Sequence, residues 1–150
     1  MVQRDFLRPT AVERAINRAF GVLVGLGLGL PHNYLLQVPG RKTGRMFSTP
    51  IDLLQIDNHL YLVCPRGRAQ WVRNAETSGW VLLKRRSTQK FAISAVADSQ
   101  KPAILKEYLD RFKTTVQRYF PVKAGAPVTA FIAHSEQYPV FELQVADQRE

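Results

Sequence analysis

The sequence predicts an α+β fold in which an antiparallel β-barrel is covered on its outside by helices. Two observations lead to this expectation. Six short runs of strand-like composition are separated by turn residues, and the order of the elements is not the succession of βαβ units that builds a parallel sheet. Two longer segments carry apolar residues at helical spacing. The length of 150 residues suits a single domain, 1–150, with one core.

The first helix is expected near the N-terminus, where Thr10-x-x-Glu13 forms a capping box. Apolar residues recur at helical spacing from Val12 to Leu23, and arginines lie on the opposite face. We expect this helix to cover the core or one end of the barrel, with contact to a membrane surface as the secondary alternative. The run 20–30 is apolar, interrupted by glycines and too short to span a bilayer. We interpret it as a helix end running into a packed loop, or else the lining of an apolar substrate entrance, so that 1–31 forms one N-terminal unit.

The six predicted strands are short, and turn residues separate them. The second strand is expected to bend at Pro50, because proline has no backbone N–H for a ladder hydrogen bond. Hairpin turns are expected at Asp57-Asn58 and around Ser87–Gln89. The predicted strands are Tyr34–Val38, Phe47–Ile56, His59–Cys64, Trp80–Arg86, Lys90–Ala97 and Val140–Val145.

Two further helices are predicted among these strands. A short helix over Ala69–Thr77 is expected to stop at Gly79, since glycine favours the left-handed conformation that ends helices. A longer helix is expected from Asp98 or Ser99 to about Tyr119, with Pro102 in its first turn.

The segment 39–50, P-G-R-K-T-G-R-M-F-S-T-P, is the strongest candidate for a binding site. Gly40 and Gly44 have no Cβ, so the backbone between them can present successive N–H groups to an anion. Arg41 can grip a phosphate with parallel hydrogen bonds, Lys42 adds a point charge, and Thr43 offers a hydroxyl. The alternative is an ordinary basic hairpin turn exposed to water.

The net charge of +9 is concentrated in the middle of the chain. Residues 41–90 hold ten Lys/Arg and three Asp/Glu, a net charge of +7, whereas residues 91–150 hold seven of each. Such a field favours a polyanionic partner, which means a phosphorylated cofactor, a nucleic acid or an anionic membrane face.

Cys64 is the only cysteine, so it has no partner for an internal disulfide or for a cysteine-based zinc site. Its apolar neighbours indicate a buried strand thiol, and no metal site is predicted. A single cysteine suits a reducing compartment, hence a cytoplasmic location, with peripheral membrane contact through the N-terminal helix as the alternative.

The succession G-R-K-T-G-R, T-P, a strand hairpin, R-G and W-V-R-N resembles the deazaflavin-dependent nitroreductases, which use coenzyme F-420. The resemblance extends from Leu35 to about Lys84, with a weaker similarity over Pro139–Leu143. It implies a split β-barrel and an oxidoreductase that transfers a hydride from the reduced deazaflavin to an unsaturated organic acceptor. Quinones, enones and nitro compounds are the implied acceptor classes.

The resemblance also implies roles for particular residues. The phosphate and part of the oligoglutamate tail would be held by Arg41, Lys42, Thr43 and Gly44. Thr49 and Pro50 would lie near the ring, and Arg66 and Gly67 in the loop that approaches it. Trp71 and Asn74 would lie on a short helix that packs against the cofactor.

Because the cofactor carries the hydride, the protein needs no acid–base pair, and none is predicted. Candidate proton donors to the reduced acceptor, from their chemistry alone, are Tyr34, His134 and Tyr138; His32 and His59 are interpreted as surface residues. Pro65 stands where many relatives carry a small hydroxyl residue, which argues against a serine-assisted step.

Several alternatives stay open. FMN or FAD in place of F-420 also suits a split barrel, since both carry phosphate. A nucleic-acid binder would use Trp71, Trp80 and Phe91 for base stacking, but no recognition motif is present, so no nucleic acid is expected. A carrier of hydrophobic ligands is the third alternative. The acceptor and the choice between monomer and homodimer are not determined by the sequence.

Overall fold

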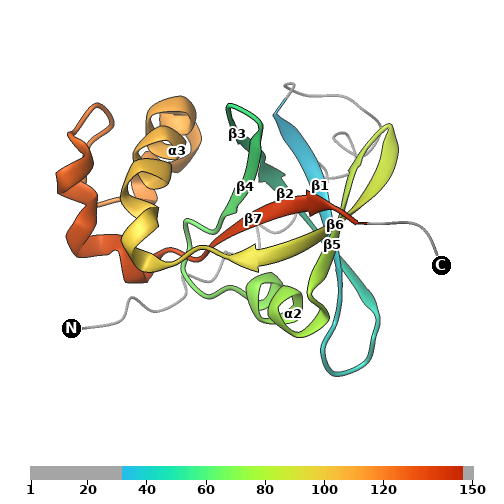
Figure 1. Cartoon of the computed structure of the whole chain (residues 1–150). Helices are drawn as coiled ribbons and strands as arrows, with labels where there is room; N and C mark the ends of the chain where they lie inside the picture. Colours follow the sequence, from blue (N-terminus) through green and yellow to red (C-terminus); the bar gives the residue numbers. More distant parts are fainter. Residues whose placement is uncertain (1–31, 147–150) are drawn as a thin grey trace.

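The computed structural model describes residues 32–146. The predicted N-terminal helix and the glycine-rich run lie outside the described residues. Seven strands form one curled antiparallel sheet in the order β2-β1-β5-β6-β7-β4-β3 (Figure 1). They are β1 (Asn33–Pro39), β2 (Met46–Asp52), β3 (Leu54–Ile56), β4 (His59–Val63), β5 (Trp80–Arg85), β6 (Ser87–Ala95) and β7 (Val140–Val145).

The α+β class and the antiparallel barrel predicted from the sequence are confirmed. Seven strands are present where six were predicted, because the chain leaves the ladder at Leu53 and divides the run into β2 and β3. There the Leu53 N–H donates to the carbonyl of His32 at 2.8 Å. Pro50 lies within β2, an edge strand, where a missing ladder donor is tolerated.

The β5–β6 hairpin turns earlier than predicted. Arg85 pairs with Ser87, and the turn is made by Arg86, whose φ is +66°. Ser87, Thr88 and Gln89 therefore belong to β6 and not to the turn. The extra pairs lengthen the ladder of backbone hydrogen bonds between the two strands. The tight turn that this requires places Arg86 in the left-handed conformation.

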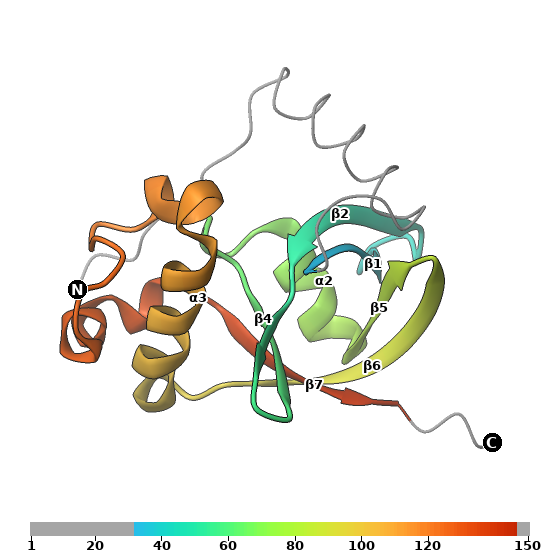
Figure 2. The same ribbon diagram turned by 90° about the horizontal axis from the view of Figure 1, so that it is seen from above.

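Two α-helices lie on different sides of the sheet. α2 (Gln70–Ser78) packs into the curl of the sheet, and Gly79 ends it in the left-handed conformation, as predicted (Figures 1 and 2). α3 (Lys101–Val116) is preceded by the 3-10 turn η1 (Asp98–Gln100) and followed by η2 (Gln117–Tyr119), so the predicted extent of the long helix is confirmed. The helical geometry of α3 is interrupted at Phe112.

The described core consists of two clusters. One fills the curl of the sheet, where Val72 and Ala75 of α2 pack with Leu36, Val81 and Phe141 from the strands. The other lies between α3, the strands β3 and β4 and the long 3-10 segment η3 (Val128–Gln137); its fully buried members include Leu54, Leu105, Leu109, Phe131 and Tyr138. The second cluster holds α3 beside the barrel.

Candidate functional site

A cleft of about 1390 Å³ lies between the β1–β2 end of the sheet, the loop that leads into α2, and the C-terminal half of α3. These walls come from segments far apart in the sequence. Eight of the ten residues that the resemblance assigns to the cofactor line this cleft, while Gly44 and Gly67 are not among its lining residues. The eight are Arg41, Lys42, Thr43, Thr49, Pro50, Arg66, Trp71 and Asn74.

The β1–β2 turn is built by hydrogen bonds within its own backbone. The Gly40 N–H donates to the carbonyl of Arg45, and the Gly44 N–H donates to the carbonyl of Gly40, both at 2.8 Å. Gly44 has a φ of +75°, in the region that glycine occupies most easily. The Thr43 hydroxyl accepts a hydrogen bond from the Arg45 N–H at 3.2 Å, so Thr43 supports the turn.

Asn74 of α2 holds this turn in place. Its side-chain oxygen accepts hydrogen bonds from the Arg41 backbone N–H at 3.1 Å and from the Arg41 guanidinium at 2.8 Å. Asn74 is only 5% exposed, so protein atoms enclose its side chain. Asn74 therefore fixes the direction of the Arg41 side chain at the cleft, although the two residues are 33 positions apart.

The cleft has a strongly positive lining. Among the described residues that line it, five carry a positive charge, from the β1–β2 turn, the loop before α2, and α3 with η2. Asp52 is the one carboxylate in the same set. Such a cleft favours an anionic ligand. The five cations are Arg41, Lys42, Arg66, Arg111 and Arg118.

The ring of Tyr119 contacts two of these arginines. The guanidinium carbons of Arg66 and Arg118 are 4.9 Å and 4.7 Å from the centre of its ring. Arg111 donates a hydrogen bond to the carbonyl of Gln55. The arginines are thus held by aromatic and backbone contacts, which limits the entropy lost when a ligand binds.

Apolar and weakly ionising groups cover the deeper wall. The Trp71 ring packs on Phe141 with centroids 6.0 Å apart. Burial raises the pKa of the Cys64 thiol to about 11, so the thiol stays protonated near neutral pH, which agrees with the predicted buried cysteine. Burial also raises the pKa of Tyr108 well above its usual value.

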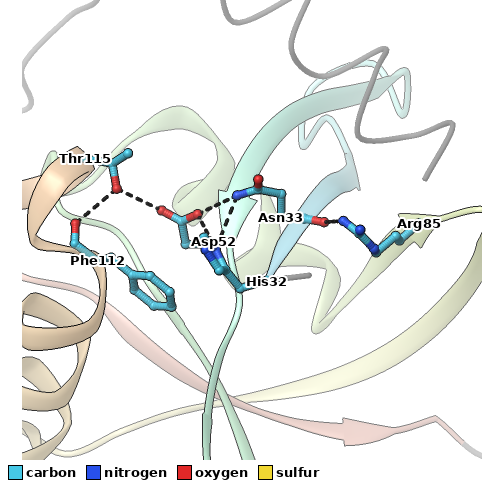
Figure 3. Close-up of polar contacts among 6 residues, drawn as sticks. All are labelled: His32, Asn33, Asp52, Arg85, Phe112 and Thr115. Carbon is cyan, nitrogen blue, oxygen red and sulfur yellow. Dashed lines mark hydrogen bonds and ion pairs between the residues drawn. The ribbon is translucent and has the colours of Figure 1, made fainter. Parts of the chain in front are cut away.

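A polar network that the sequence reasoning missed lies at one edge of the cleft (Figure 3). Nδ1 of His32 lies 3.0 Å from Oδ1 of Asp52, and the Asn33 amide donates to the same oxygen at 2.8 Å. Thr115 of α3 lies 3.4 Å from the other carboxylate oxygen. His32, interpreted from the sequence as a surface residue, therefore belongs to the cleft wall. The sequence gives no signal that Asp52 is its partner, because their contact depends on the β1–β2 register, in which Asn33 pairs with Asp52.

The three predicted proton-donor candidates lie elsewhere. Tyr34 lines a second, smaller hollow of about 450 Å³. Tyr138 is fully buried, and its hydroxyl donates to the carbonyl of Tyr119 at 2.6 Å. His134 in η3 lies 3.3 Å from the Gln137 amide. None of the three is among the described residues that line the cleft.

Residues 32–146 lack the features of two other kinds of site. Within this range no group of three or more His, Cys, Asp and Glu is arranged to hold a metal ion. In the same range no helix combines the length and the apolar character that crossing a membrane requires.

Solved structures share this fold at low sequence identity. An F-420-H2 dependent reductase is 12% identical with a TM-score of 0.52, over 79% of this chain and 100% of its own. A FAD-binding protein from Mesorhizobium loti is 11% identical with a TM-score of 0.51, over 93% and 91% of the two chains. A structure described as a domain-swapped dimer is 13% identical with a TM-score of 0.54, over 89% and 93%. At these identities the likeness shows the fold alone.

Sequence comparison identifies the family. A search of curated protein sequences finds no match to this chain. The sequence profile of the F-420H(2)-dependent quinone reductases, in contrast, matches residues 10–127, which include the β1–β2 turn, α2 and all the described residues that line the cleft. Because this match extends over more than half of the chain, the protein belongs to the F-420H(2)-dependent quinone reductase family of oxidoreductases.

Proposed function

We propose that the protein transfers a hydride from reduced coenzyme F-420 to an unsaturated organic acceptor, with quinones as the first class to test and enones and nitro compounds as the next. The observation that carries this proposal is the cleft, in which five cations and one carboxylate stand beside aromatic and aliphatic side chains. A cofactor with a phosphate, an acidic tail and a flat ring matches that combination of charge and apolar surface.

The residues present fit the cofactor. In this proposal Arg41, Lys42 and Thr43 hold the phosphate and tail, whereas Gly44, which does not line the cleft, shapes their turn. Asn74 keeps Arg41 in position through their hydrogen bonds. Thr49, Pro50, Arg66 and Trp71 surround the ring, and Gly67 belongs to the loop beside it without lining the cleft. When bound, F-420 supplies the hydride, and the chain contributes orientation, charge and exclusion of water.

The apolar side of the cleft suits the acceptor. Phe112 and Val116 of α3 line it, and both are buried. A flat, hydrophobic acceptor such as a quinone would bury apolar surface there, at about 25 cal/mol per Å². The ring of the cofactor would lie between this surface and the cationic turn.

The test is a titration of the purified protein with oxidised F-420, followed by turnover of a quinone with the reduced cofactor. We expect Arg41→Ala to weaken F-420 binding about tenfold or more, because a hydrogen bond to a charged group contributes about 1.5–3 kcal/mol. Arg45→Ala is the matched control, since Arg45 is an exposed cation of the same turn that does not line the cleft. Equal losses for both variants would contradict the assigned site.

FMN or FAD is the alternative cofactor, because both carry phosphate and a FAD-binding protein shares the fold. The same titration decides between the cofactors, since tighter binding of FMN or FAD than of F-420 would overturn the preference for the deazaflavin.

A nucleic-acid binder is less well supported: Phe91 is buried and Trp71 packs on Phe141, so these rings do not form an open stacking face. Tight binding of a DNA duplex, with an affinity that falls steeply as salt is added, would favour nucleic-acid binding instead.

Dimerisation and location are also proposals. The likeness to a domain-swapped dimer supports a homodimer, which light scattering during gel filtration would distinguish from a monomer. The single, buried Cys64 supports a reducing cytoplasmic location. Peripheral membrane contact would depend on the predicted helix before residue 32, outside the described residues.

A further inference from the structure

The His32–Asp52 pair has the geometry of an oriented imidazole (Figure 3). Asp52 is the last residue of β2, and His32 directly precedes β1. Oδ1 of Asp52 accepts from the Asn33 amide at 2.8 Å and lies 3.0 Å from Nδ1 of His32. A carboxylate only accepts hydrogen bonds, so Nδ1 carries the hydrogen in this contact. The Asn33 nitrogen also lies 3.3 Å from Nδ1, but its shorter bond is the one to Asp52.

Neighbouring contacts fix the pair from several elements. The carbonyl of Asn33 accepts a hydrogen bond from Arg85 of β5 at 2.8 Å. The His32 ring lies 4.7 Å from the ring of Phe112, and Thr115 donates to the Phe112 carbonyl at 3.0 Å while its hydroxyl lies near Asp52. With Nδ1 engaged, Nε2 is the nitrogen available to a ligand; within residues 32–146 the structure gives it no hydrogen bond.

His32 is the one imidazole, and Asp52 the one carboxylate, among the described residues that line the cleft. Imidazole is the side chain suited to giving and taking a proton near neutral pH. Cys64 and Tyr108, which also line the cleft, suit this role poorly, since burial raises the pKa of Cys64 to about 11 and that of Tyr108 well above its ordinary value. The hydroxyl of Tyr119, a third such group, is engaged by Arg118, which donates a hydrogen bond to it at 2.5 Å. The surrounding charges are Arg41 and Lys42 from the turn, Arg66 before α2, and Arg111 and Arg118 from α3 and η2.

We propose that His32 donates the proton that completes reduction of the acceptor, and that Asp52 is the positioning residue which orients its ring. This inference rests on the proposed function of the cleft. When a quinone or enone accepts the hydride, a carbon–oxygen or carbon–carbon π bond breaks and the electron pair moves to the carbonyl oxygen. That oxygen takes the proton from Nε2 of the imidazolium, which leaves neutral His32 with Nδ1–H still bound to Asp52. Water at the cleft mouth returns the proton, because the His32 side chain is 32% exposed.

Two other roles compete with this one. The five cations alone would stabilise the oxyanion electrostatically, with water supplying the proton afterwards. Alternatively, the network only fastens α3 to the end of β2 through Thr115 and Phe112. The experiment has to separate both of these from proton donation.

The first variant is His32→Asn, because an asparagine amide nitrogen can replace Nδ1–H against Asp52 but has no titrating group in the place of Nε2. We expect kcat for quinone reduction to fall about 100-fold, in the range that general acid catalysis contributes, while the Kd for F-420 changes less than twofold. We expect added imidazole to restore much of the activity of His32→Ala, since a small imidazole can fill the space and donate the proton.

The matched control is His59→Asn. His59 forms a similar pair with Glu142, at 2.6 Å between Nδ1 and Oε1, but lies on β4 outside the cleft lining. This variant should keep wild-type kcat and show no response to imidazole. A response equal to that of His32→Ala would overturn the proposal, as would wild-type kcat in folded His32→Asn. Loss of activity without imidazole rescue, together with a lower Tm, would assign the network the fastening role.

A measurement without turnover keeps the proposal testable if the variants do not fold. Nitrogen-15 NMR of the wild-type protein should find Nδ1 of His32 protonated and hydrogen-bonded, and Asp52→Asn should weaken that signature. A neutral His32 with its proton on Nε2 would overturn the proposal. Failure of the wild-type protein to bind F-420 would instead contradict the proposed function, and it would leave the tautomer result unchanged.

Discussion

Asn74 and Arg41 show how much a single contact decides at the residue scale. A buried amide oxygen accepts two hydrogen bonds from one arginine, and so converts an exposed turn into part of a cleft wall. The sequence pattern marked both residues, but it assigned Asn74 to the cofactor directly. The structure gives Asn74 a partner within the chain. Its effect on a ligand would then pass through Arg41.

Asn74→Ala tests that role. The substitution leaves the Arg41 N–H and guanidinium without their acceptor, so we expect the free energy of unfolding to fall by about 1–3 kcal/mol and F-420 binding to weaken. Urea denaturation and cofactor titration measure the two effects. Thr77→Ala, an exposed position on the same helix, is the control and should stay close to wild type. Unchanged binding in folded Asn74→Ala would contradict the anchoring role.

Gly44 offers a second test, because its φ of +75° strains any residue with a Cβ. No atom outside its chain neighbours lies within 4 Å of a Cβ built there, so the conformation alone sets the cost. We expect Gly44→Ala to lower the free energy of unfolding by about 1–2 kcal/mol. Gly44→Asn should cost less, since asparagine tolerates this conformation better. Thermal unfolding of the two variants would reveal the order, and a reversed order would contradict the strain.

Cys64 should be chemically inert in the folded protein. It is 2% exposed, and its pKa of about 11 leaves little thiolate near neutral pH. We expect iodoacetamide to leave it unmodified under native conditions and to alkylate it after denaturation in urea, as mass spectrometry would measure. Rapid alkylation of the native protein would indicate that β4 opens readily at this end.

At the scale of elements, α3 has two functions along its length. Its buried residues fasten it to η3 and the strands, and its C-terminal part, from Tyr108 to Val116, supplies one wall of the cleft. The interruption of helical geometry at Phe112 lies within the part of the helix that lines the cleft. The stability of the helix and the shape of the cleft are therefore coupled.

Leu109→Ala measures the fastening. Leu109 has no exposed surface, so truncation leaves a cavity and should lower the free energy of unfolding by about 2–5 kcal/mol in urea titration. Lys113→Ala, on the exposed face of the same helix, should change it by less than about 0.5 kcal/mol. Similar values for the two variants would mean that α3 does not pack as described.

At the scale of the whole molecule, charge should govern binding. The chain carries a net charge of +9, and five of its cations line the cleft with one carboxylate. Raising the salt concentration from about 0.05 M to about 0.5 M should weaken F-420 binding, because screening shortens the reach of these charges. The deazaflavin ring without phosphate and tail is the matched ligand, and its affinity should depend much less on salt. Equal salt slopes would indicate that the cations do not contact the tail.

Most elements followed from local patterns. Gly79 ends α2 and the long helix spans the predicted range, since caps and apolar periodicity act over a few residues. The Leu53 break and the turn at Arg86 were missed, because the first depends on a hydrogen bond to His32 and the second on strand pairing. The predicted proton donors lie away from the cleft, while His32 lines it, because long-range pairing and packing decide which side chains reach the cleft.

The sequence by itself determined the basic, glycine-flanked turn and the class of the fold, because backbone conformation, charge and apolar periodicity are properties of neighbouring residues. Only the tertiary structure decided what that turn faces. Arg41 meets Asn74 across 33 positions, and His32 meets Asp52 across 20. Such meetings depend on strand register and helix packing, which the free energy of the whole core selects.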